Sequence, residues 1–191
     1  MRTYQLTASA PRRSHPWTTT TANPAHRYVD LRAFPELIPR VLEDFRPYDG
    51  EPAVQAFYRL IGAINGDASL LESNDCAFTG PEPTTTAGVT QRLECSGRIG
   101  VLFRELRRNT DAAAVASFVG DVHARLATVD PTFQGGAVAT SSVDVDYRLL
   151  PAGARAGTQT LVWFWAWGDD PAEVFANLER VIAALGVVLA G

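Results

Sequence analysis

The stretch "TLVWFWAWGDD" near the C-terminus constrains the fold more than any other part of the chain. Its tryptophans recur at every second position, which is the side-chain period of a β-strand. Both sets of alternating positions are apolar, one with Val162, Phe164 and Ala166 and the other with Trp163, Trp165 and Trp167. A strand that is apolar on both faces is typical of a sheet covered on both sides. We therefore expect a strand over 158–167, with helices packed on the smoother face and another cover over the indoles.

The segments around this strand predict a β-α-β-β-α order in the second half of the chain. They are two strands within 89–106, joined near Ser96 and Gly97, a helix over 109–130 with Thr110 as its N-cap, an alternating strand over 137–150, the tryptophan strand, and a helix that begins after Asp170. This order indicates a ferredoxin-like α+β fold, in which helices cover one face of an antiparallel sheet.

The first half predicts additional elements. Residues 1–28 contain no Asp or Glu and are rich in Thr, Pro and Arg, a composition that does not fold by itself. We expect an extended arm there, anchored by Trp17, followed by a single α+β domain over 29–191. The remaining expected elements are a short helix over 34–45, an amphipathic helix over 50–65 and a long loop over 66–88.

All 17 basic residues are arginine, which excludes several kinds of chemistry. Without lysine there is no Schiff-base nucleophile, no internal pyridoxal-phosphate aldimine and no P-loop lysine. Two cysteines are too few for an iron–sulfur cluster or a four-cysteine zinc site. No metal-binding or dinucleotide-binding motif occurs, so we expect neither a metal nor a cofactor.

Charge and hydropathy indicate the location and the partners. A net charge of −4 argues against a nucleic-acid partner. No apolar run reaches the roughly 18 residues of a membrane span, and no signal peptide is visible. We expect a cytoplasmic protein with reduced thiols, and its arginine and alanine usage is typical of a high-GC bacterial genome.

The polar face of the strand over 137–150 supplies the preferred catalytic candidates. If its apolar residues face the helices, Asp144 and Asp146 share the open face of the sheet with the indoles of the next strand. This predicts a pocket for a cationic or amine-bearing small molecule, since cations are attracted to indole rings and a carboxylate can act as a general base. Its residues would be Asp144, Asp146 and Glu94 as acid/base groups, with Trp163, Trp165, Trp167 and Arg104 binding the substrate.

Two other functions stay open. In the first, the chain is a non-catalytic homo-oligomeric protein whose tryptophan face is a subunit interface. In the second, it is a cysteine enzyme using Cys76 with His123, Glu72 and Asp75. The acidic neighbours of Cys76 oppose thiolate formation, so the cysteine enzyme ranks last.

Overall fold

The computed structural model describes residues 1–7, 10–17, 29–42 and 48–190. Its strands are β1 (Arg2–Gln5), β2 (Arg13–His15), β3 (Leu71–Pro83), β4 (Leu93–Phe103), β5 (Gly136–Tyr147) and β6 (Arg155–Gly168). Its α-helices are α1 (Pro52–Asn65), α2 (Ala112–Val129) and α3 (Pro171–Leu189), and its short 3-10 helices are η1 (Pro35–Arg40), η2 (Tyr48–Gly50) and η3 (Leu106–Thr110). None of the described helices is both long and apolar enough to cross a membrane.

The six strands form one mixed sheet in the order β1-β5-β6-β4-β3, with β2 also beside β5. The pairs β3–β4, β4–β6 and β5–β6 are antiparallel, whereas β1 and β2 run parallel to β5. The expectation of a purely antiparallel sheet is therefore wrong, because the arm adds two parallel strands at one edge. The predicted β-α-β-β-α order is present as β4-α2-β5-β6-α3, but the strand on the outer side of β4 is β3, which precedes it in the chain.

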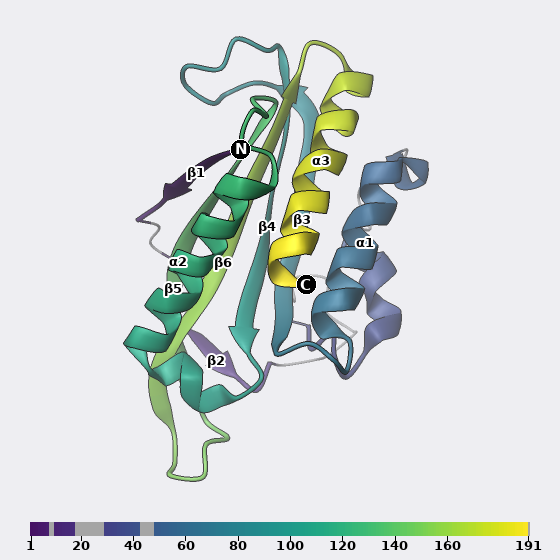
Figure 1. Cartoon of the computed structure of the whole chain (residues 1–191). Coiled ribbons are helices and arrows are strands. Elements are labelled where there is room, and N and C mark those ends of the chain that lie inside the picture. Colours follow the sequence, from purple (N-terminus) through teal and green to yellow (C-terminus); the bar gives the residue numbers. More distant parts are fainter. Residues whose placement is uncertain (8–9, 18–28, 43–47, 191) are drawn as a thin grey trace.

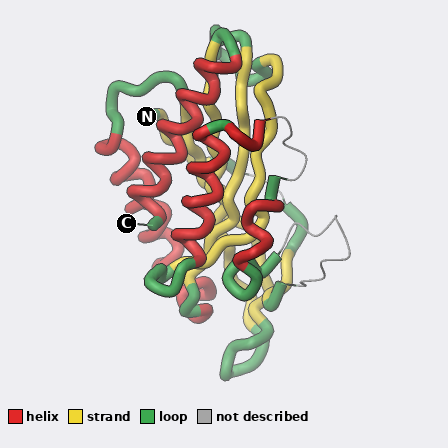
Figure 2. Tube along the Cα trace, turned by 90° about the vertical axis from the view of Figure 1, so that its right-hand side faces the viewer, coloured by secondary structure: helices red, strands yellow, loops and turns green. Residues whose placement is uncertain are grey.

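All three α-helices lie on one face of the sheet, with α3 between α1 and α2 (Figure 1, Figure 2). Phe164 of β6 points into this layer, and its ring centroid lies 5.9 Å from that of Phe57 in α1. The main core fills the space between helices and sheet. It includes Val54, Ile61, Phe78, Ile99, Val138, Val162, Leu178 and Leu185.

Two helices begin at side-chain caps. Asp170 accepts a hydrogen bond from the N–H of Glu173 at 2.9 Å and so caps the start of α3. The N-cap of α2 is Asp111 and not Thr110, because the Asp111 carboxylate accepts hydrogen bonds from the N–H groups of Ala113 and Ala114. An aspartate also interacts favourably with the positive end of the helix dipole.

The structure corrects two predictions about the strands. The expected loop over 66–88 contains β3, whose pairing with β4 shifts register between Asn74 and Ala77 and again between Thr79 and Glu82. The two expected strands of 89–106 are one strand, β4. Gly97 lies inside this strand and does not mark a turn. The position requires glycine because a Cβ there would overlap the side chains of Phe78 and Phe164.

The short helix expected over 34–45 is the 3-10 helix η1, which has Pro39 inside it. The positions 43–47 of that prediction lie outside the described residues.

Candidate functional site

The face of the sheet turned away from the helices carries the tryptophan row. Residues directly opposite each other in paired strands share a face. One row across the sheet therefore contains Tyr4, Ala139, Trp163 and Arg98, and the next contains Ala137, Trp165 and Ser96. We call Tyr4, Ser96, Arg98, Trp163 and Trp165 the indole face.

Asp144 and Asp146 lie on the other side of the sheet. They are opposite Thr158 and Ala156 in β6 and lie on the same face of β5 as Thr140, because they are an even number of residues from it. That face is turned toward the helices, since the hydroxyl of Thr140 lies 2.9 Å from Nε2 of His123 on α2. The expectation that these carboxylates share a face with the indoles is therefore wrong.

The reason is a second apolar cluster on the open face. It contains Trp17, Leu102, Val145, Tyr147 and Leu150, so the apolar side of β5 packs against the arm rather than against the helices. A change of facing by one position moves every side chain of a strand to the other face. Asp144 and Asp146 instead form exposed ion pairs with Arg12, at 3.3 and 2.9 Å.

The indoles lie across neighbouring small residues. Nε1 of Trp163 donates a hydrogen bond to Oγ of Ser141 at 2.9 Å, which carries this ring over β5. Ala137 and Ala139 are opposite the two indoles and are fully buried, although each has only a methyl group. On the other side of Trp163, the guanidinium carbon of Arg98 is 6.0 Å from the ring centroid. Trp163 and Trp165 are half-buried, and Tyr4 beside them is 46% exposed.

Trp167 and Glu94 hold a loop in place. Trp167 is buried, and its Nε1 donates to Glu94 at 3.2 Å. The Glu94 carboxylate also accepts from the hydroxyls of Thr85 and Thr86, at 2.9 and 2.8 Å. Burial alone would raise the pKa of Glu94, but these hydrogen bonds outweigh it and lower the pKa. Glu94 is thus a fixed carboxylate that ties residues 84–92 to the sheet.

A buried ion-pair network lies beside the indole face, centred on Asp75. Its Oδ2 accepts from Arg13 of the arm at 2.7 Å, and its Oδ1 accepts from Nε and NH2 of Arg98 at 3.0 and 2.8 Å. The Asp75 side chain is 4% exposed and its φ is +47°, a conformation that Asn and Asp adopt more readily than most residues. Buried charges of this kind are stable only when paired and hydrogen-bonded.

Amide side chains extend this network across the sheet. Arg13 donates to Oε1 of Gln159 at 2.7 Å, and Gln159 donates to Oδ1 of Asn74. Gly100 makes room for them, because a Cβ there would lie 2.7 Å from Oδ1 of Asn74 and 2.9 Å from Nε2 of Gln159. Sequence reasoning named Asp75 only as a neighbour of Cys76, since the partners of Asp75 are far away in the chain.

Glu72 joins the arm to the same region. Its carboxylate is 3.7 Å from Nε2 of His15 and 4.0 Å from NH1 of Arg32. The His15 ring in turn lies edge-on to Trp17, with centroids 5.0 Å apart, and 5.7 Å from Tyr147.

The residues of the predicted cysteine site are not brought together. Cys76 points into the main core, where burial, with a smaller contribution from the charge of Asp75, raises its pKa to about 12. His123 contacts Thr140 on β5, three strands away from β3 in the sheet order. Cys95 is also buried, its pKa is raised to about 12, and both thiols are free. Neither thiol is ionised at neutral pH.

Arg104 has a structural partner set. Its guanidinium donates to the backbone carbonyls of Asn65 at 2.8 Å, Gly66 at 2.6 Å and Leu71 at 3.0 Å. These include carbonyls at the C-terminal end of α1, which have no partner within the helix. Arg104 therefore caps α1, and none of these contacts is with an indole.

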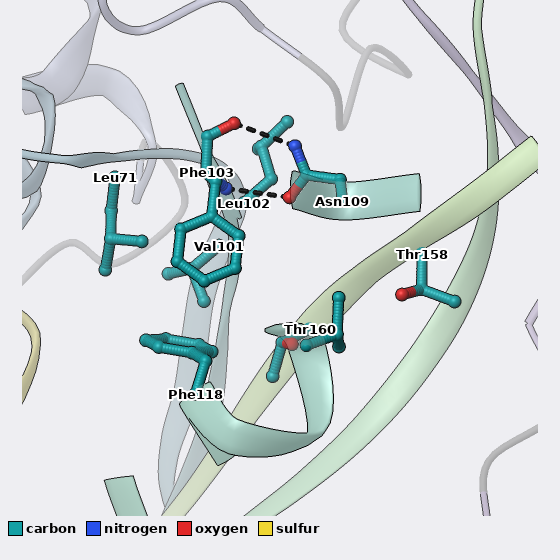
Figure 3. A pocket seen from close by; sticks show the side chains of 9 residues that line it. Leu71, Val101, Leu102, Phe103, Asn109, Phe118, Thr158 and Thr160 are labelled. Carbon is teal, nitrogen blue, oxygen red and sulfur yellow. Dashed lines mark hydrogen bonds between the residues drawn. The ribbon is translucent and has the colours of Figure 1, made fainter. Parts of the chain in front are cut away.

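A small hollow lies between α2, η3 and the sheet (Figure 3). The space in it that is open to a water molecule is about 10 Å³, which is roughly enough for one water and too small for a substrate. Its lining residues include Phe103, Phe118, Thr158 and Thr160, together with Asn109. Asn109 is engaged on both sides of its amide by the backbone of Phe103, at 2.8 Å each.

Comparison with known protein families, curated proteins and solved structures finds no match to this chain. Within the described residues, no group of three His, Cys, Asp or Glu side chains is placed to hold a metal ion.

Proposed function

We propose that the chain is a non-catalytic interaction protein that assembles with a second copy of itself through the indole face. The observation that carries this proposal is the half-buried state of Trp163 and Trp165 on the sheet face opposite the three described α-helices. Large aromatic side chains each contribute on the order of 150–250 Å² of contact when they are buried. Tyr4 and Leu6, 46% and 39% exposed, extend the apolar area at the β1 edge.

The chemistry of this face is that of a protein interface. Trp, Tyr and Arg are enriched at the centre of interfaces and carry much of the binding free energy. The residues directly opposite the indoles in the neighbouring strands include three small ones, Ala137, Ala139 and Ser96. Such a surface suits face-to-face packing of two sheets. Small ligands prefer concave sites.

Self-complementarity favours a second copy as the partner. A two-fold interface needs both halves of each contact on one surface, and the indole face presents a guanidinium beside an indole. Charges of opposite sign stand at its two edges, with Arg2 at the β1 edge and exposed Glu82 at the β3 edge. A two-fold axis along β6 would bring Arg2 of one copy over Glu82 of the other.

The groups that sequence analysis assigned to catalysis already have structural partners. Glu94 is held by Thr85 and Thr86, and Asp75 by two arginines. Asp144 and Asp146, which sequence analysis placed beside the indoles, lie on the other face, and Arg98 stands beside Trp163 instead. These contacts support an interaction function over the acid/base enzyme.

Sedimentation velocity of two matched variants tests the proposal. Trp165→Asp places a charge in the centre of the indole face and should convert the dimer to a monomer. Val187→Asp places the same charge at a 51% exposed position of α3 and should leave the dimer intact. A wild-type chain that sediments as a monomer, or two variants with the same mass as the wild type, would reject the proposal.

A further inference from the structure

Among the described elements, the hairpin formed by β5 and β6 extends farthest at one end of the molecule (Figure 1, Figure 2). Its last paired residues are Tyr147 and Arg155. Beyond them the chain turns over 150–153, where the N–H of Gly153 donates to the carbonyl of Leu150 at 2.9 Å. Pro151 is the second residue of this turn, a position that favours proline because its φ is fixed. The tip of the hairpin is therefore an ordered turn that stands away from the body.

The hairpin tip, which we define as residues 149–154, contains no polar side chain. It reads Leu-Leu-Pro-Ala-Gly-Ala, although hairpin turns commonly contain Asn, Asp or Ser. Leu150 is buried in the cluster of Trp17, but Leu149 is 64% exposed, and Pro151 and Ala152 are exposed as well. Single apolar residues on a surface are ordinary, whereas here an unbroken apolar segment forms the outermost point of the fold.

An exposed arginine stands on each side of the hairpin tip. Arg148 precedes it and Arg155 follows it, and residues 147–157 contain no acidic side chain. Exposed Arg107 belongs to η3, which packs against β6 where a Cβ on Gly157 would overlap the carbonyl of Asn109. The apolar tip is thus bordered by guanidinium groups.

The negative net charge of the whole chain does not cancel this local positive charge. Exposed charges are largely screened from one another beyond about 8–10 Å at ordinary ionic strength. The carboxylates nearest to the tip along β5 are Asp144 and Asp146, and both form ion pairs with Arg12. A negatively charged surface that approaches the tip therefore meets Arg148 and Arg155 first.

We propose that the hairpin tip inserts into the surface of a membrane that contains anionic lipids. Leu149 and Pro151 enter the boundary between the headgroups and the acyl chains, and Arg148 and Arg155 stay at the level of the lipid phosphates. Arginine suits this place because its apolar stem packs against apolar groups while its guanidinium binds phosphate oxygens. The projecting turn lets these side chains reach lipid while the folded body stays in water.

This inference does not rest on the proposed dimer, because the hairpin tip and its arginines are complete within one chain. A single small apolar anchor with a few basic residues gives reversible binding and not permanent anchoring. Binding should therefore depend on both the apolar tip and the anionic lipid.

Flotation of the full chain with lipid vesicles tests the proposal. The vesicles contain phosphatidylcholine alone or equal parts of phosphatidylcholine and phosphatidylserine, in a buffer of low ionic strength. The wild-type chain should float with the mixed vesicles and not with phosphatidylcholine alone. Leu149→Asp should abolish this binding, and Arg148→Gln and Arg155→Gln should each weaken it about fivefold, as expected for one basic residue near an anionic surface.

The matched control is Val187→Asp, which adds the same charge at a 51% exposed position of α3 and should float like the wild type. Insertion is read from the environment-sensitive fluorophore NBD attached to Leu149→Cys, since the native thiols are buried. Its emission should shift to the blue with the mixed vesicles, and the same label on Val187→Cys should not shift.

Three results would each overturn the proposal. The first is a wild-type chain that floats with neither kind of vesicle, and the second is a Leu149→Asp variant that floats as well as the wild type. The third is flotation of the labelled Leu149→Cys variant without a blue shift, because the chain would then attach through another surface. None of these results bears on the mass measurements that test the dimer.

Discussion

Asp75 connects the arm to the indole face. One carboxylate oxygen binds Arg13, and the other binds Arg98, which lies beside Trp163. Removing one member of a buried ion pair costs more than the pair contributes, because the remaining charge stays buried without compensation. The stability of the arm contact and the position of the Arg98 guanidinium therefore both depend on this one side chain.

Replacing Asp75 by Asn should lower the free energy of unfolding by about 3 kcal/mol, as expected for loss of one partner of a buried ion pair. Asn keeps the size of the side chain and tolerates a positive φ, so the loss would report the charge and not the backbone. Asp144→Asn is the matched control in the exposed pair with Arg12, and its effect should be small. Urea unfolding measures both. Equal and small losses would show that the Asp75 network does not stabilise the fold.

Both cysteines should be unreactive in the folded protein. Burial raises each pKa from the ordinary 9.0 to about 12, so the thiolate is scarce at neutral pH. Iodoacetamide at pH 7.5 should label the folded protein only at the rate at which it unfolds. The urea-unfolded protein should be labelled at once. Rapid labelling of Cys76 in native buffer would contradict its place in the core and revive the cysteine enzyme.

The same thiols predict a loss of stability at alkaline pH. The unfolded chain releases their protons near 9.0 and the folded chain only near 12. Their contribution is thus complete below about pH 9 and is lost as the pH rises from 9 toward 12. The free energy of unfolding should fall between pH 9 and 12, and the double variant Cys76→Ala, Cys95→Ala should show a shallower fall. Identical slopes would contradict the assignment.

At the scale of the elements, sequence analysis failed on two points: which face of the sheet the side chains of β5 point to, and where an irregular strand occurs. The helices α1, α2 and α3 and the strand of tryptophans follow from apolar periodicity and were predicted close to their observed bounds. β3 was missed because its sequence, "LESNDCAFTGPEP", is polar and contains turn residues, and its two register shifts remove the regular alternation. The facing of β5 was inverted because both of its possible covers, the helices and Trp17, are apolar.

Glycines in β4 should tolerate alanine far less than a helical glycine does. A Cβ at Gly97 overlaps Phe78 and Phe164, and one at Gly100 meets Asn74 and Gln159. Gly97→Ala and Gly100→Ala should each lower the free energy of unfolding by about 1–3 kcal/mol. Gly62→Ala in α1, with no atom within 4 Å of the added methyl group, should raise it by about 0.5–1 kcal/mol. Thermal unfolding of the three variants decides the point, and a stabilising Gly100→Ala would refute the described packing.

At the scale of the whole molecule, the two faces of one sheet are covered unequally. Within the described residues, the three α-helices cover one face, and Trp17 of the arm packs on the part of the other face that contains Val145, Tyr147 and Leu102. The row of indoles could be read from the sequence, because alternation alone places them on one face. The Asp75 network could not, because it joins residues separated by 62 and 23 positions.

The most direct test of the account is acrylamide quenching of tryptophan fluorescence during dilution, with the mass of each sample measured by sedimentation equilibrium. Trp17 and Trp167 are 7% and 4% exposed within one chain, so changes in quenching report Trp163 and Trp165. The double variant Trp163→Phe, Trp165→Phe supplies the baseline for the buried pair. We predict that the mass falls from twice 20.7 kDa to 20.7 kDa on dilution, and that quenching of the wild-type chain rises with it. Quenching that stays constant while the mass halves would contradict the account, since the indoles would then lie outside the interface.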